Sequence, residues 1–217
     1  MDEGWTTVKG RHRRPKNTKS APSSLLSPAT RTVPHLEVTE MKDEYNTVLR
    51  KFMKSTSYHI IRTIAWEFTL NAEQIPITKA ICLGIGTFDP SDGSLAIKQK
   101  AHKQLAAFLV MVEELEIPSL TKPQQLEKHT GGHIECIFQE PMFTPGDISF
   151  LNEMGHRVVE SPVGSEAVDS QTFLYGVHLY KDIYSMSLQG ELPAVFVGTG
   201  WDAWSEYVFK TPFRTSF

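Results

Sequence analysis

Two glycines and a carboxylate lie where the sequence predicts that buried strands end. Gly84 and Gly86 follow an apolar run at residues 79–83. A glycine there lets the backbone turn tightly or approach a ligand closely, because it has no Cβ. Glu140 ends a second apolar run, and a carboxylate in that place can bind ribose hydroxyls. The third glycine of the dinucleotide fingerprint is absent. The acidic residue of that fingerprint normally lies about 20 residues after the glycines, and Glu140 lies much further from Gly86. The glycines therefore indicate either a ligand-binding loop or only a turn.

His178 is the candidate catalytic residue, because it follows an apolar run at residues 172–175. A histidine can act there as acid, base or ligand. A histidine that only bonds a loop carbonyl is the commoner case, since no catalytic partner or known catalytic motif accompanies it. The residues expected to bind a small-molecule cofactor are Gly84, Gly86, Thr87, Phe88, Glu140, Pro141 and Gly198.

These residues need strands and helices that bring them to one edge. Apolar runs predict five strands, at residues 79–83, 134–138, 156–160, 172–175 and 194–197. Helical patterns lie between them, at residues 94–115, 144–154 and 180–188. Thr144 as cap, Pro145 at the first helical position and Asp147 predict the start of the second of these helices. The alternation of strands and helices predicts a Rossmann-like three-layer α/β fold, with a mostly parallel sheet and helices on both faces. The strand order 3-2-1-4-5 is a candidate for such a sheet. Ligands of such sheets bind beyond the carboxyl ends of the strands. Gly84, Gly86, Glu140 and His178 should therefore line one crevice.

The N-terminal segment differs in composition from the rest. Residues 1–35 are rich in Ser, Pro, Thr and basic residues without periodicity, which predicts a disordered tail. Residues 1–32 carry seven Lys and Arg against two Asp and Glu, a net charge of +5, which leaves −8 for the remainder of a chain with net charge −3. A basic tail on an acidic body favours nuclear targeting or loose nucleic-acid contact, and a solvated leader is the alternative.

Residues 36–217 are expected to form the α/β domain, and residues 36–70 two helices that cover its sheet. In the second helix, Ile60, Ile61, Ile64 and Ala65 are expected to face inward. Glu113 and Glu114 should belong to a solvated face of the helix that follows the first strand. Trp201 and Trp204 follow the fifth strand and either stack on a ligand or bury a closing helix.

Cysteine use and hydropathy indicate the compartment. Cys82 and Cys136 lie singly in apolar runs, which predicts buried thiols and neither a disulfide nor a metal site. The longest apolar run, residues 105–112, is far shorter than a bilayer requires, and the polar, basic start does not resemble a signal peptide. We therefore expect no membrane partner and a cytoplasmic or nuclear protein.

Several short segments, taken in order, resemble the sensitivity-to-red-light-reduced-like (SRR-like) domain family. They are residues 5–8 with the arginines that follow, residues 81–88, 104–106 and 139–143, His178, and residues 197–201. The acidic residue before proline at the second strand end, usually Asp, is Glu140 here. The resemblance implies regulatory roles, in light and clock signalling in plants and in haem-synthesis regulation in animals, without an established activity.

The sequence leaves three functions open. The first is a regulatory or interaction protein with protein partners and a small-molecule pocket in its Rossmann-like domain. The second is a nucleotide- or S-adenosylmethionine-dependent transferase, which the expected strand order would suit. The third is a nucleic-acid-associated protein that acts through its basic tail. The sequence does not identify the cofactor, and fold analogy does not choose among the three.

Overall fold

The structure is a computed structural model that describes residues 33–71, 76–116 and 133–200, all within the unit formed by residues 31–217. Trp5, Trp201 and Trp204 lie outside the described residues. The elements in chain order are α1 (Val38–Phe52), α2 (Thr56–Asn71), β1 (Lys79–Leu83), α3 (Leu95–Glu116), β2 (Glu135–Gln139), α4 (Pro145–Glu153), β3 (Arg157–Val158), α5 (Val163–Glu166), β4 (Thr172–Gly176), α6 (Lys181–Ser187) and β5 (Val195–Gly198).

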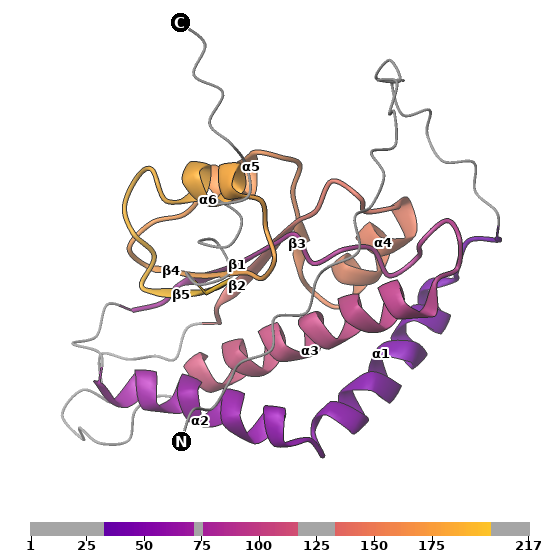
Figure 1. Cartoon of the computed structure of the whole chain (residues 1–217), viewed down its shortest axis with the longest axis horizontal. Coiled ribbons are helices and arrows are strands. Elements are labelled where there is room, and N and C mark those ends of the chain that lie inside the picture. Colours follow the sequence, from indigo (N-terminus) through magenta and orange to yellow (C-terminus); the bar gives the residue numbers. More distant parts are fainter. Residues whose placement is uncertain (1–32, 72–75, 117–132, 201–217) are drawn as a thin grey trace, which may run out of the picture. The chain divides into compact units, whose positions relative to one another are not determined.

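The five strands form one parallel sheet in the order β3-β2-β1-β4-β5 (Figure 1). Ile81 at the centre of β1 is in register with Ile137 of β2 and Leu174 of β4. The predicted fold class and strand order are confirmed. The chain moves outward through β2 and β3 on one side of β1 and through β4 and β5 on the other. The order therefore reverses between β1 and β4, the place where parallel α/β sheets commonly bind ligands.

Side chains of β1 alternate between the two faces of the sheet, as strand geometry requires. Ala80 and Cys82 belong to the larger core, which contains residues of α1, α2, α3 and α4. Ile81 and Leu83 belong to a smaller cluster with Leu179 and with Ile183 of α6. Figure 1 shows the same division, with α5 and α6 on one face and α3 on the other. The Cys82 and Cys136 thiols are buried and free, as predicted, and burial raises the pKa of both.

The first two helices pack chiefly against α3. Ala65 of α2 is buried and Ile61 packs against the core. The prediction that Ile60 and Ile64 face inward is wrong, because they are 53% and 55% exposed. Contact with one neighbouring helix buries only a narrow stripe that contains Ile61 and Ala65. Ile60 and Ile64 lie about 100° from these residues around the helix axis, and so fall outside the stripe.

Glu114 of α3 is also placed differently from the prediction. It is 5% exposed, and its carboxylate accepts a hydrogen bond from the Arg62 guanidinium of α2. The expectation of a solvated face holds for Glu113, which is exposed, but is wrong for Glu114. A buried carboxylate requires such a partner because desolvation otherwise disfavours its charge. The pair thus joins α2 to α3.

The connection from the third to the fourth strand contains a short helix that the sequence pattern did not reveal. Strand β3 is confined to Arg157–Val158, and α5 follows it before β4. Because β4 pairs with β1, the chain passes back across the sheet, and α5 contacts β1 and β2 on the way. Among the described helices, none has the length and apolar character needed to cross a bilayer.

Candidate functional site

The loop between β1 and α3 carries both predicted glycines at the carboxyl edge of the sheet. Gly84 and Gly86 have φ angles of 69° and 85°, a region that favours glycine. A Cβ on Gly84 would lie 2.1 Å from Cδ2 of Leu179, so this glycine permits close packing of the β4–α6 loop. A Cβ on Gly86 would have no described atom within 4 Å. The open approach to the loop is therefore at Gly86.

Glu140 at the end of β2 is joined directly to this loop. Its Oε2 accepts a hydrogen bond from the Gly86 N–H at 2.8 Å, and its Oε1 accepts one from the Met142 N–H at 2.9 Å. The Glu140 side chain is part-exposed, and Pro141 and Met142 form an exposed turn beside it. The structure thus brings Gly86 and Glu140 together, although 54 residues separate them in sequence.

Thr87 and Phe88 connect the loop to the start of α4. The Thr87 hydroxyl and the Phe88 N–H donate to the Asp147 carboxylate at 2.6 and 3.0 Å. Asp147 also accepts from the Thr144 N–H, and Thr144 caps α4 through the Asp147 N–H, as the sequence predicted. Burial raises the pKa of Asp147, while its hydrogen bonds partly offset this rise. Thr87 and Phe88 are buried, so these two residues set the shape of the loop.

The loops after β4 and β5 meet each other at the same edge. His178 is exposed, has a φ of 64°, and donates its backbone N–H to the Thr199 hydroxyl at 2.8 Å. The Tyr184 hydroxyl donates to the Gly176 carbonyl and accepts from the Thr199 N–H. Among described residues the His178 imidazole has no hydrogen-bond partner, and the predicted crevice shared with Gly84, Gly86 and Glu140 stays a prediction.

Gly198 lies at the end of β5 and is partly covered. A Cβ there would lie 2.5 Å from the Phe196 ring, so this ring fills the space that a side chain would occupy. Leu179 makes the equivalent contact over Gly176, at 2.5 Å from a built Cβ. The β4 and β5 loops are therefore closely packed, in contrast to the open backbone at Gly86.

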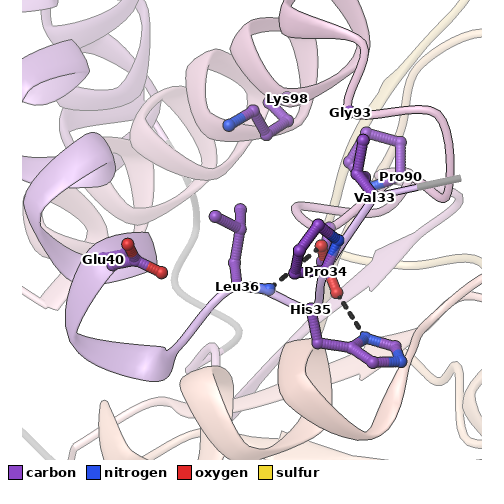
Figure 2. A pocket seen from close by; sticks show the side chains of 9 residues that line it. Val33, Pro34, His35, Leu36, Glu40, Pro90, Gly93 and Lys98 are labelled. Carbon is purple, nitrogen blue, oxygen red and sulfur yellow. Dashed lines mark hydrogen bonds and ion pairs between the residues drawn. The ribbon is translucent and has the colours of Figure 1, made fainter.

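A cavity of about 310 Å³ lies where the β1–α3 loop meets the chain before α1 (Figure 2). The buried Asp89 carboxylate lies 2.8 Å from Nδ1 of His35, and its other oxygen accepts from the Leu36 N–H at 3.4 Å. Glu40 and Lys98 complete the polar part of the wall. Sequence reasoning grouped His35 with the tail and did not select it, because its only signal is a partner 54 residues away.

The polar residues at this edge can bind and orient a small molecule through backbone N–H groups and carboxylates. In the described parts of the chain, no three His, Cys, Asp or Glu side chains are grouped so as to hold a metal ion.

A family model described as the SRR1 domain matches residues 41–215. No curated protein and no solved structure gives a significant match. The matched range contains all five strands of the parallel sheet and both Gly86 and Glu140. The chain therefore belongs to the SRR1 domain family.

Proposed function

We propose that this SRR1 domain protein is a regulatory binding protein that holds a small molecule at the carboxyl edge of its sheet. Gly86 and Glu140 make the direct contacts in this proposal. Gly84, Thr87 and Phe88 shape the loop, and Pro141 and Gly198 border the site. The regulatory role, in signalling or control of a biosynthetic route, is what the family resemblance implies.

One observation carries the proposal: the Gly86 backbone is open and lies beside a carboxylate at the ends of adjacent strands. The Glu140 side chain reaches the loop, and no described atom occupies the space next to Gly86. This is the end of a parallel sheet at which ligands bind, and small-molecule sites commonly combine open backbone with few polar groups.

Binding is better supported than catalysis by the placement of the titratable groups. His178 is exposed, and no described residue orients its imidazole. A catalytic base normally has a second group that fixes its orientation. Both Glu140 oxygens accept backbone N–H groups, and the Asp147 carboxylate completes the capping box of α4 by accepting the Thr144 N–H. The strand order favours a transferase as the second candidate, since nucleotide-dependent enzymes use such sheets.

The experiment that tests the proposal is a thermal-shift and calorimetry panel on the full chain with ATP, NAD, S-adenosylmethionine and haem. A ligand at 100 times its Kd should stabilise the fold by about 2.7 kcal/mol. For a domain of this size that corresponds to a Tm rise of about 5–10 °C. Absence of a shift with every compound would oppose a site for these ligand classes.

A pair of glycine variants separates the site from general stability. Gly86→Val places a branched side chain at the proposed approach and should abolish binding. Gly155→Val is the matched control, because Gly155 has a φ of 86° and equally open surroundings but follows α4 at the opposite edge of the sheet. Both variants carry the same backbone strain. Equal loss of binding in both would contradict a site at Gly86.

His178→Ala distinguishes the two candidate functions once a ligand is identified. A transferase that uses this imidazole should lose turnover by a factor on the order of 10² or more and still bind its ligand. The proposed regulatory binder should show only a change in affinity. If the wild-type chain turns over a substrate and His178→Ala abolishes that turnover, the result would favour the transferase.

We propose in addition that the basic residues of the 1–35 segment direct nuclear or cytoplasmic location, or give loose contact with nucleic acid. The net charge of +5 in residues 1–32 supports this role. Replacing Arg11, Arg13 and Arg14 with Gln should change nuclear accumulation or flatten the salt dependence of nucleic-acid binding. If neither changes, these residues are only a solvated leader.

A further inference from the structure

A second cavity, of about 300 Å³, lies between α1 and α3, away from Gly86 and Glu140. Asp43, Glu44 and Lys51 line it from α1, and Lys98, Gln99 and His102 line it from α3. Lys98 also lines the cavity of about 310 Å³ shown in Figure 2, so the two cavities share a wall. We refer to both together as the α1/α3 cleft.

His102 is a buried polar residue of this cleft without hydrogen-bond partners. It is 1% exposed, and neither ring nitrogen forms a hydrogen bond with any described residue. Its ring packs against Phe88 and Phe150, with centroid separations of 5.0 and 6.1 Å. Nearly all buried polar atoms in proteins are paired, because leaving one unpaired is unfavourable. The imidazole therefore indicates a group that occupies the cleft.

The Glu44 carboxylate, the charged group nearest to His102, indicates the chemistry of the ligand group that could occupy the cleft. Oε2 of Glu44 lies 3.5 Å from Nε2 of His102, while Oε1 of Glu44 is 2.5 Å from the Lys98 ammonium. Burial lowers the pKa of His102, which favours the neutral ring with one acceptor nitrogen. A donor that lies beside Nε2 and Oε2 and bridges them would bond both atoms, and an ammonium group offers three donors and no acceptor.

The charge of the cleft favours the same chemistry. Four carboxylates line the two cavities, from Glu40, Asp43, Glu44 and Asp89, against the ammonium groups of Lys51 and Lys98. The excess negative charge attracts cations, and each cavity is at the lower end of the volume range of small-molecule sites.

We propose that the α1/α3 cleft binds a small organic cation that carries primary ammonium groups. One ammonium group lies between Glu44 and His102, and a second reaches the Glu40 side of the cleft beyond Lys98. This site is separate from the proposed ligand loop, so each proposal can fail without the other.

The test is calorimetric titration of the full chain with putrescine and spermidine, with 1,4-butanediol as the uncharged control of similar length. Saturable binding of the amines is expected, with affinity that falls as salt increases, and no binding of the diol. Equal binding of the diol, or no binding of either amine at millimolar concentration, would overturn the proposal.

Variants locate the amine within the cleft. Glu44→Gln keeps the shape and removes the charge, and should weaken putrescine binding at least tenfold. Glu153→Gln is the matched control, because Glu153 also pairs with a lysine, Lys42, but lies on α4. His102→Phe keeps the aromatic packing, removes both nitrogens, and should also weaken binding at least tenfold. Equal weakening by Glu153→Gln would overturn the site.

Nuclear magnetic resonance gives a readout that does not depend on the His102 variant folding. The ¹⁵N shifts of the His102 imidazole in the wild-type chain should move during titration with putrescine, saturating with the calorimetric Kd. Unchanged His102 shifts at saturating amine would show that the cation binds elsewhere and would overturn the proposal.

Discussion

Asp147 and His102 are both buried polar side chains, and their surroundings are opposite. Asp147 is fully buried and accepts hydrogen bonds from the Thr87 hydroxyl and from two backbone N–H groups. His102 is 1% exposed and has no hydrogen-bond partner among described residues. Burial of a polar group is unfavourable unless hydrogen bonds replace those lost with water. The fold therefore explains why Asp147 is buried, but it does not explain His102.

This difference indicates that Asp147 stabilises the fold through its hydrogen bonds, whereas the ring nitrogens of His102 are available to bond a ligand. Asp147 joins the β1–α3 loop to the first turn of α4, and so fixes the loop that carries Gly86. His102 contributes aromatic packing, while its nitrogens form no hydrogen bond with a described residue and only Nε2 lies near a charged group, 3.5 Å from Oε2 of Glu44. Substitution at the two positions should therefore change stability in opposite directions.

The largest effect is expected for Asp147→Ala, which should lower the free energy of unfolding by about 3 kcal/mol. The variant loses the capping box and leaves the Thr87 hydroxyl and two N–H groups without their acceptor. Urea denaturation measures the loss. Asp147→Asn retains one acceptor oxygen and should lose less. A loss below about 1 kcal/mol for the alanine variant would remove the contrast with His102.

His102→Phe should instead raise the free energy of unfolding by about 1 kcal/mol. The substitution removes two unpaired buried nitrogens and keeps an aromatic ring among Tyr45, Phe88 and Phe150. The same urea experiment in amine-free buffer checks it. A loss of more than about 1 kcal/mol would mean that the imidazole nitrogens make bonds that stabilise the fold.

The third prediction concerns pH. Burial lowers the pKa of His102, so below its ordinary value of 6.5 the unfolded chain binds a proton that the folded chain does not. Stability should therefore fall as pH falls through 6.5, whereas Glu44 opposes this effect and Lys98 adds to it. Between pH 7 and 5.5 the wild-type chain should lose about 1 kcal/mol more than His102→Phe. Parallel pH profiles would refute it. His156, whose pKa is also lowered by burial, contributes equally to both chains.

The smallest effect is expected when residues 1–30 are removed. Their polar composition offers little apolar surface, and the deletion retains His35 and its contact with Asp89. The Tm should stay within about 2 °C of the full chain in a calorimetric scan. A larger fall would show that the segment contributes buried contacts.

Local patterns predicted much of the fold because they depend on neighbouring residues. The alternation of apolar runs with helical patterns predicted a parallel sheet, and Thr144, Pro145 and Asp147 predicted the start of α4. Contacts between distant residues were beyond such patterns. The inward prediction for Ile60 and Ile64 failed because the width of a buried stripe depends on the partner helix.

The candidate site shows the same limit. The sequence placed glycines and Glu140 at strand ends, and the structure joins Gly86 to Glu140 directly. The sequence could not reveal that Leu179 covers Gly84, or that the Asp89 carboxylate pairs with His35, because the two residues of each pair lie far apart along the chain. His102 lies among the core residues Ala101, Leu105 and Ala106 on α3, so its unpaired nitrogens have no signature in sequence.

The hydrogen bond between Gly86 and Glu140 has a consequence for ligand charge. The Gly86 N–H is the type of donor that Gly-rich loops offer to a phosphate, but here a tethered carboxylate already accepts it. A phosphate would have to displace this carboxylate and would be repelled by it, since both are anions. A sugar hydroxyl can instead donate to the carboxylate and leave the loop unchanged. In the proposed site, the Glu140 carboxylate would therefore favour a ligand that presents a hydroxyl or cationic group to Gly86 over one that presents a phosphate.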